Sequence, residues 1–184
     1  MNNKILFKKI IYFPVLIFIF STGISIADYP QTSLGVIDLN FILVEAKAAK
    51  NAAEQIEAIA IEIEAEIKAN DQSLIDEQNK LIESQSIMAP DAFDEKRKEY
   101  EKKVQNYNIT RQEKLISIDK LVSDSRNNVL SALKPILDDI SNEKGITVLL
   151  EKNSVLLNDE SMDITNEALK RLNKELPSIE IKLN

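Results

Sequence analysis

The chain has 184 residues, 44% of them hydrophobic, and its 23 basic and 30 acidic side chains give a formal net charge of −7. It contains no histidine, cysteine or tryptophan, which excludes disulfides, the common zinc, copper and haem sites, and nucleophile systems built on Cys-His or Ser-His pairs. The acidic balance also argues against a nucleic-acid binder, which needs a basic surface. We therefore expect no cofactor, no metal and no nucleic-acid partner.

The first 27 residues are predicted to be an export signal. Lysines precede an eleven-residue apolar run at 10–20, which is interrupted only by Pro14. The run is shorter than the roughly 20 apolar residues that cross a membrane, and small residues lead up to Ala27, where a signal peptidase would cut. We expect cleavage after Ala27, which leaves 20 basic and 30 acidic residues and a net charge of −10. The alternative is an uncleaved membrane anchor.

A short strand and the start of a helix are predicted after a loose leader. Residues 34–39 alternate and contain the β-branched Val36 and Ile37, which favours a strand. Asn40 then precedes three apolar residues and is expected to be the N-cap of a helix. Residues 28–43 thus form the first part of a predicted β-rich body.

A long first helix is predicted over 45–87, a stretch of 43 residues with neither glycine nor proline and with many alanines near its start. At about 1.5 Å per residue it would reach roughly 65 Å, far beyond a compact domain of this mass. Two ladders of residues at seven-residue spacing predict a coiled-coil seam: Ala60, Ile67, Leu74 and Leu81, and Ile56, Ile63, Asn70 and Glu77. Asn70 and Glu77 either face solvent because the heptad pattern drifts, or give the arm a mixed surface for many weak contacts.

The helix is predicted to break near 87–91 and to fold back on itself. Pro90 fits the first turn of a new helix and disfavours helix at the residue before it. A second helix over 91–142 should therefore return antiparallel to the first, so that 44–129 forms a helical hairpin. Pro135 should kink or loosen the returning helix, since its ring removes one helical hydrogen bond.

Five residues at or near the tip are candidate contacts for a bound partner. Phe93, Tyr100 and Tyr107 fall on one heptad ladder. Arg97 intrudes among them, and Met88 is an adaptable apolar side chain at the turn. The alternative is that the aromatic residues pack between the two helices and that Met88 plugs the turn. A basic cluster near the tip could also meet lipid headgroups, but a solvated face is the simpler interpretation and nothing else supports membrane contact.

The second part of the body is predicted to contain two further strands. Gly145 ends the returning helix, residues 146–150 form a strand, and 155–157 pair back as a hairpin, which with 34–39 gives a three-stranded sheet. The open edges of such a sheet invite pairing between copies of the chain. The predicted body, 28–43 and 130–184, is expected to associate through eight apolar strand positions: Val36, Ile37, Leu39, Ile146, Val148, Leu149, Val155 and Leu157.

The C-terminal residues are predicted to form a short helix and a frayed tail. Asp163 or Thr165 can cap a helix over 166–174, which Pro177 ends. Apolar residues alternate with polar ones at 179–183, but so short a terminal segment is expected to fray rather than to pair.

These segments, in this order, resemble the Skp (OmpH) family of periplasmic chaperones over essentially the whole mature chain. The most specific parts of the resemblance are Gly-Val-Ile-Asp-Leu-Asn at 35–40 and Lys-Gly-Ile-Thr-Val-Leu-Leu at 144–150. Asp-Ile-Thr at 163–165, before the last helix, and Met-Ala-Pro-Asp-Ala-Phe at 88–93, at the turn, complete it.

The resemblance implies an α+β protein that assembles as a jellyfish-like homotrimer in the periplasm. In this family a small β-rich body joins the three chains, and long antiparallel coiled-coil hairpins project as tentacles around a cavity. Members hold unfolded outer-membrane β-barrel proteins there without nucleotide and keep them from aggregating. The best-known members are basic whereas this chain is acidic, so the resemblance implies neither a lipopolysaccharide site nor capture of clients by charge alone.

The leading hypothesis is therefore an ATP-independent periplasmic holdase that binds unfolded outer-membrane proteins and has no catalytic residue. A periplasmic coiled-coil scaffold or adaptor that binds one folded partner is the alternative. An enzyme that uses carboxylates alone is a more distant alternative, because acidic pairs such as Asp138-Asp139 lack the spacing of a calcium loop and lie near no recognisable pocket.

Overall fold

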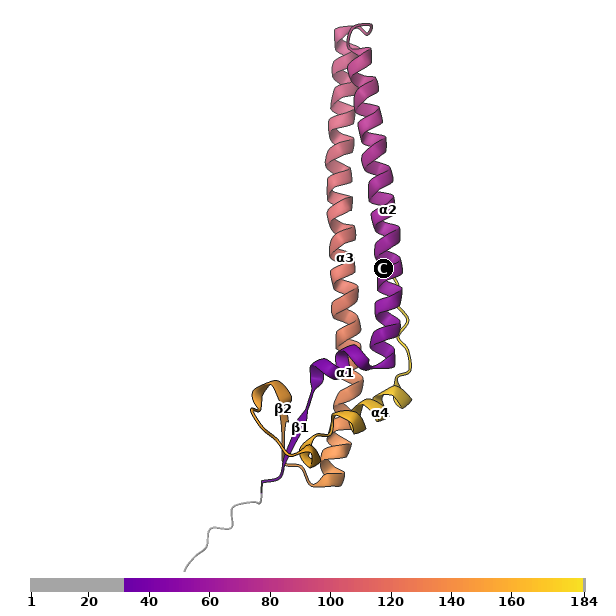
Figure 1. Cartoon of the computed structure of the whole chain (residues 1–184). Helices are drawn as coiled ribbons and strands as arrows, with labels where there is room; N and C mark the ends of the chain where they lie inside the picture. The colour runs from indigo at the N-terminus through magenta and orange to yellow at the C-terminus, as the bar shows by residue number, and fades with distance from the viewer. Residues whose placement is uncertain (1–31, 184) are drawn as a thin grey trace, which may run out of the picture. The chain divides into compact units, whose positions relative to one another are not determined.

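The computed structural model describes residues 32–183, so the predicted export signal and the first residues of the leader lie outside the described residues. In chain order the elements are β1 (Leu34–Ile37), α1 (Leu39–Glu45), α2 (Lys47–Ser84), α3 (Pro90–Lys144), β2 (Val148–Glu151) and α4 (Thr165–Glu175), with short 3₁₀ turns at Lys152–Ser154 and Glu160–Met162. The described chain is mostly helical with one small strand pair. The predicted α+β class with a long helical hairpin is therefore confirmed (Figure 1).

Helices α2 and α3 lie side by side and form the predicted arm (Figure 1). The break between them falls where the sequence predicts it, because α2 ends at Ser84 and α3 begins at Pro90. Pro90 lacks an N–H, but the first turn of a helix has no intrahelical acceptor for one. Asp91 places a negative charge at the positive end of the helix dipole. Within residues 32–183, no helix combines the length and the apolar content that crossing a membrane requires.

Pro135 does not end α3, which continues as one helix to Lys144. The side chains on either side of it, Leu133 and Ile136, are buried in the body. Their packing outweighs the single hydrogen bond that the proline ring removes. One unbroken helix therefore runs from the body to the tip of the arm.

The hydrophobic core lies where α1, the first turns of α2, the last turns of α3, and α4 meet. Its largest fully buried side chains include Ile42, Leu133, Ile136, Ile140 and Leu172, and each contributes about 1.5–3 kcal/mol. The small Ala48 and Ala52 allow the helices to approach closely. Among the described residues, α2 has no buried side chain after Ile63 and α3 has none before Ser125. The distal arm thus has no core of its own.

The sheet consists of β1 and β2 in parallel, in register from Leu34 opposite Val148 to Ile37 opposite Glu151. Parallel pairing is possible because the long helical hairpin serves as the crossover between the two strands. The second strand is close to the predicted 146–150, and the first ends two residues earlier than predicted.

The predicted third strand at 155–157 is wrong. Lys152–Ser154 forms a 3₁₀ turn that leads the chain away from β2, and the two leucines that follow are fully exposed. The free side of β1 is taken instead by the segment before α4, where the Ile164 N–H donates to the Val36 carbonyl oxygen at 2.9 Å. This segment pairs with β1 in preference to 155–157 because it brings the Ile164 side chain into the core, where it is 3% exposed.

The start of α1 also differs from the prediction. Asp38, not Asn40, caps the helix, since its Oδ1 accepts a hydrogen bond from the Phe41 N–H at 2.8 Å. Leu39, predicted as the last strand residue, is the first residue of α1. The chain therefore turns from strand to helix two residues earlier than expected.

The side chains of Ile146 and Leu149 leave little room for a side chain at position 35 of β1. A Cβ placed on Gly35 would lie 2.9 Å from Ile146 Cδ1 and 3.1 Å from Leu149 Cδ1. Replacing Gly35 with valine should lower the free energy of unfolding by about 1–3 kcal/mol through overpacking, as measured by urea denaturation. Gly35→Ala should cost less, because the atoms that its methyl group meets are ends of flexible side chains. A valine variant of unchanged stability would contradict this packing.

Candidate functional site

The two helices of the arm meet along a half-buried seam. On α2 the half-buried positions after Ile63 are Ile67, Asp71, Leu74, Glu77, Leu81 and Ser84. Asn70, predicted on the seam, is exposed, and Asp71 takes its place. The cause is that a straight α-helix has 3.6 residues per turn and drifts out of a seven-residue pattern. The solvent-facing interpretation is thus correct for Asn70, whereas Glu77 does lie at the seam.

Two of the predicted contact residues tie the helices of the arm together. The Tyr100 hydroxyl donates to the Leu74 carbonyl oxygen at 3.2 Å, and the Tyr107 hydroxyl donates to the Ile67 carbonyl oxygen at 2.9 Å. Desolvation, and then the nearby Asp71 carboxylate, raise the pKa of Tyr107 above its ordinary value of 10.0. Both rings are half-buried, and only their outer parts can meet a partner.

The other three predicted contacts lie nearer the tip. Met88 and Phe93 are half-buried at the turn. Arg97 is exposed, and its guanidinium lies 3.4 Å from Asp94 Oδ1 and 3.0 Å from Glu101 Oε1 on the same helix. The five predicted residues are therefore spread from the tip to the middle of the arm rather than gathered in one pocket.

Ion pairs between largely exposed side chains join α2 and α3 at several levels. Lys103 pairs with Glu77, and Lys114 pairs with Glu66. Exposed pairs of this kind contribute about 0.2–1 kcal/mol each. The arm is thus held by many weak contacts along its length.

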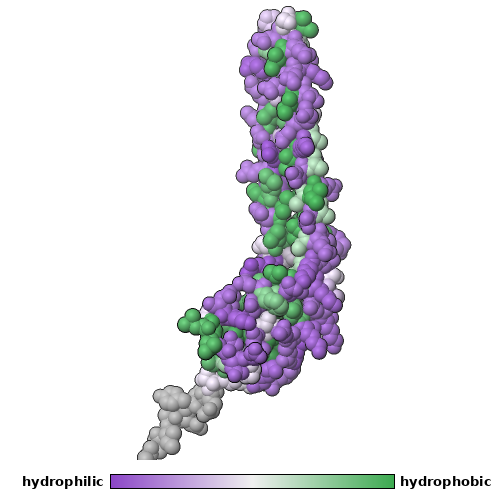
Figure 2. Space-filling view, in the orientation of Figure 1, coloured by the Kyte–Doolittle hydropathy of each residue, from purple (hydrophilic) through white to green (hydrophobic). Residues whose placement is uncertain are grey.

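A series of exposed apolar residues on the arm was missed by the sequence predictions. This exposed apolar series consists of Ile61, Ile75, Ile82, Ile87, Ile109, Leu115, Ile116 and Val122. Figure 2 shows apolar patches among polar side chains along the visible face of the arm. Several members recur at seven-residue spacing outside the seam, so a search for further ladders could have found them. Together these side chains offer apolar area along the arm that another protein can cover.

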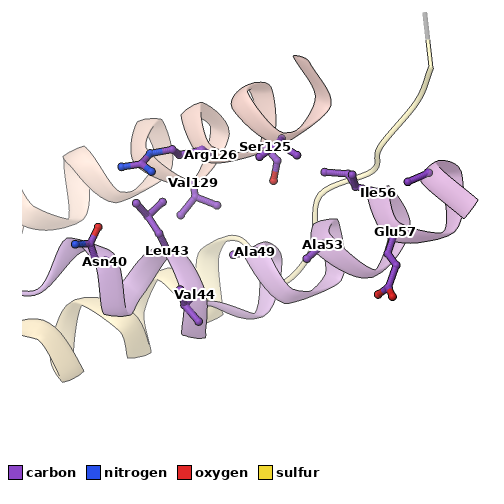
Figure 3. Close-up of a pocket in the computed structure, with 12 residues that line it drawn as sticks. Asn40, Leu43, Val44, Ala49, Ala53, Ile56, Glu57, Ser125, Arg126 and Val129 are labelled. Carbon is purple, nitrogen blue, oxygen red and sulfur yellow. The ribbon is translucent and has the colours of Figure 1, made fainter. Parts of the chain in front are cut away.

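An apolar groove lies at the base of the arm, between α1, α2 and α3. It has a volume of about 640 Å³, and Figure 3 shows Arg126 and Val129 of α3 near Leu43 of α1, with Ser125 above Ala53 of α2. The space exists because three positions that line it on α2 carry short side chains: Ala49, Ala53 and Ala60. The groove can accept apolar side chains, and Arg126 and Glu57 place opposite charges at its rim.

The eight residues predicted to join copies of the chain fall into two groups. Five stabilise the protomer itself, because they are buried or pack against its core: Val36, Ile37, Leu39, Ile146 and Leu149. Three remain available to another copy, because they are exposed or half-buried: Val148, Val155 and Leu157. The body exposes five further apolar residues that were not among the predicted eight: Leu34, Phe41, Leu150, Leu156 and Leu183.

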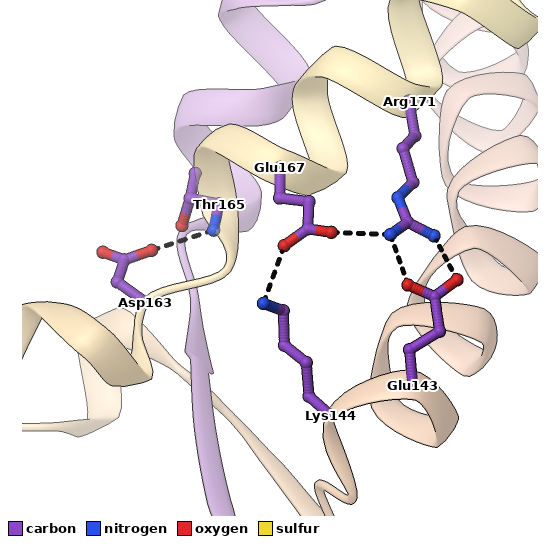
Figure 4. A network of polar contacts seen from close by, with 6 residues as sticks. All are labelled: Glu143, Lys144, Asp163, Thr165, Glu167 and Arg171. Carbon is purple, nitrogen blue, oxygen red and sulfur yellow. Dashed lines mark hydrogen bonds and ion pairs between the residues drawn. The ribbon is translucent and has the colours of Figure 1, made fainter.

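A polar network fastens α4 to the end of α3 (Figure 4). The Arg171 guanidinium donates to the two Glu143 oxygens at 2.8 and 2.6 Å and to Glu167 at 2.6 Å, and Lys144 Nζ lies 3.0 Å from Glu167. Hydrogen bonds from Arg171 lower the pKa of Glu143, and hydrogen bonds from Lys144 and then Arg171 lower the pKa of Glu167. Both carboxylates stay ionised, so the network is a clamp rather than an acid–base pair. Across residues 32–183, no acidic cluster is arranged to hold a metal ion.

Removing this clamp should make the stability of the body less sensitive to acid. A carboxylate with a lowered pKa stabilises the fold above its ordinary value of 4.5, and that stabilisation is lost as the pH falls through the lowered value. The melting temperature of the unaltered chain should therefore fall in acid. Arg171→Met should melt at a lower temperature at neutral pH and show a smaller fall in acid. Lys170→Met removes the neighbouring charge and should keep the original dependence of the melting temperature on pH. If the unaltered chain and Arg171→Met show the same melting temperature at every pH, the clamp is refuted.

Comparisons with known proteins agree with this architecture. Residues 33–172 match the model of a family described as OmpH, outer membrane protein (OmpH-like). A crystal structure from Caulobacter crescentus CB15, of a protein provisionally described as an outer membrane chaperone (OmpH-like), matches with a TM-score of 0.76 and 15% sequence identity. The match covers 85% of this chain and 92% of that chain, and at this identity it shows a shared fold. No curated protein matches the chain.

Proposed function

Because residues 33–172 match its model, the chain belongs to the OmpH-like outer membrane protein family, and we propose that it is an ATP-independent holdase chaperone of the periplasm. In this proposal residues 1–27 direct export and are removed after Ala27. The mature protein then binds unfolded outer-membrane β-barrel proteins between helical arms and keeps them from aggregating. The observation that carries the proposal is the distal arm, in which two long helices expose apolar side chains and bury none after Ile63 of α2 or before Ser125 of α3.

A surface of this kind suits a client that must stay unfolded and be released without energy input. Each apolar contact contributes about 25 cal/mol per Å² of buried area, so a series of separate contacts gives useful affinity while each one breaks easily. The strands of membrane β-barrels alternate apolar and polar residues. An unfolded client therefore offers small apolar groups at intervals, which matches the exposed apolar series on the arm.

We propose that the client contacts comprise the exposed apolar series together with five residues toward the tip. Met88 and Phe93 offer partly exposed apolar surface at the turn, and Arg97 offers a charge. Tyr100 and Tyr107 contribute the outer parts of rings whose hydroxyls are already bonded across the arm.

We further propose that three copies join through the body formed by 28–43 and 130–184, so that each hairpin at 44–129 projects as an arm. Within the described residues β2 has a single strand neighbour, which leaves one edge open for pairing. The exposed Val148 lies on this strand, and the exposed Leu156 and Leu157 follow it closely in sequence. Small bodies of this kind commonly gain stability by association.

An aggregation assay tests the proposed function. Stoichiometric amounts of the mature protein, without ATP, should suppress light scattering when several unrelated urea-denatured β-barrel proteins are diluted into buffer. An acidic globular protein of similar mass serves as the control and should not protect them. A chain that protects none of these clients but captures one folded envelope protein would instead be a scaffold, and turnover of a small molecule would indicate an enzyme.

A further inference from the structure

The start of α2 is not capped by its own neighbours. Ala46 is extended, with φ −60° and ψ 136°, and interrupts the helices on either side of it without offering a side-chain hydrogen bond. The cap comes from α4, because the Lys47 N–H donates to Asn173 Oδ1 at 2.7 Å. The first turn of the arm is therefore held by a residue 126 positions later in the chain.

Two turns further along α2, Gln55 binds the C-terminal tail through the tail's main chain. Its Nε2 donates to the Ile179 carbonyl oxygen at 2.7 Å, and its Oε1 accepts from the Ile181 N–H at 3.0 Å. Asn51 orients the amide, since Gln55 Nε2 also donates to Asn51 Oδ1 at 2.8 Å. The Gln55 side chain thus pairs with a main-chain carbonyl and a main-chain N–H of the tail that lie two residues apart, as a neighbouring β-strand would.

The tail is also held by packing. Ile179 is only 8% exposed, and Ile181 packs against the hydrophobic core. Figure 1 shows the tail running from α4 alongside the first turns of α2. The predicted fraying of this segment is therefore wrong, because its partner Gln55 lies far away in sequence and could not be seen in the local pattern.

These contacts act on the one helix of the arm that is not continuous with the body. Helix α3 runs unbroken from the body into the arm, whereas α2 begins anew at Lys47. Because Arg171 clamps α4 to Glu143 at the end of α3, α4 and the tail together connect the base of α2 to α3 by a second route.

We infer that residues 173–183 form a strap that fixes the first turns of α2 to the body, with Gln55 as the positioning residue where the strap closes. When the strap is released, α2 can pivot at Ala46. Resting on the proposed function, this device sets how readily the arms open for a client. The strap lies entirely beyond the family match, which ends at Leu172.

Amide hydrogen exchange on the full chain tests the strap without any client. Gln55→Ala removes both hydrogen bonds to the tail, so amides 51–58 of α2 and 179–183 of the tail should exchange about tenfold faster. Amides 130–134 and 136–140 of α3 should keep their rates, which separates strap release from general destabilisation. Gln72→Ala is the matched control, because Gln72 is exposed on the same helix and its amide bonds to Asp76.

The unaltered chain provides a second measurement that does not depend on a variant folding. The Ile181 amide should exchange at least about tenfold more slowly than an unprotected amide, since it donates to Gln55. Exchange of Ile181 at the unprotected rate, or equal rates at 51–58 in the Gln55→Ala and Gln72→Ala variants, would overturn the strap. Because this readout involves no client, a strap that is present in a chain without holdase activity would refute only the proposed function.

Discussion

Replacing Val148 with aspartate should convert the proposed trimer into a folded monomer. Val148 is 40% exposed in the protomer and lies on β2, whose outer edge has no strand neighbour within residues 32–183. A carboxylate there is hydrated in the monomer, but it would be buried without a partner if copies pair along this edge, which is strongly unfavourable. Light scattering should report the mass of one chain, and circular dichroism should report unchanged helix content.

Two further variants separate association from folding. Val148→Thr keeps the branched shape without a charge and should remain largely trimeric. Leu133→Asp buries a charge in the protomer core, where Leu133 is 1% exposed, and should unfold the chain with a loss of about 3–5 kcal/mol. Leu149 is a poorer test position, because it packs against that core. If the Val148→Asp variant keeps the mass of the unaltered assembly, the interface lies elsewhere. If the unaltered chain is itself a monomer, the trimer is refuted.

The helical hairpin could be predicted because its signals are local. The absence of glycine and proline from 45–87 favours the long helix that the structure has at Lys47–Ser84, and Pro90 determines where the next helix starts. Neither signal depends on distant residues. The predicted class and the position of the break were therefore correct. The interruption at Ala46 was not predicted, because no local signal marks it.

The second neighbour of β1 could not be predicted, because it depends on contacts more than a hundred residues apart. The apolar residues at 155–157 fit a hairpin locally, yet the Asp38 N–H donates to Thr165 Oγ1 at 2.9 Å and Ile164 fills the core. The burial of Ile164 in the core outweighs the local preference of the short apolar run at 155–157 for a strand. The tail that binds Gln55 escaped prediction for the same reason.

The candidate site was predicted only in part, because a seven-residue ladder shows spacing but not phase. Tyr100 and Tyr107 were correctly placed on one ladder, and the structure shows that this ladder faces the other helix. Ile75 and Ile82 recur at the same spacing but are exposed. Which ladder faces inward is decided by the drift of a straight helix and by the partner helix, and both are properties of the folded arm.

Shortening both helices of the arm equally should abolish protection of large clients and spare small ones. Tyr107 bonds to Ile67 across the arm, so deleting 67–80 from α2 and 94–107 from α3 removes opposing stretches. Each deletion spans two heptads and keeps the inward faces in phase. It removes about 21 Å of the roughly 57 Å that the 38 residues of α2 span. The body is untouched, so the assembly should form as before.

The expected loss depends on client size, because the space between arms of constant width shrinks in proportion to their length. Removing roughly a third of that length should leave a small β-barrel client protected in the aggregation assay, whereas a client that fills the original space should aggregate. A full-length variant with Ile82→Ser and Ile116→Ser separates length from surface chemistry, since it keeps the space and removes exposed apolar contacts that the shortened chain retains. It should protect both clients less well. If the shortened chain protects large clients as fully as the unaltered one, clients are not held between the arms and the contact surface must lie on the body.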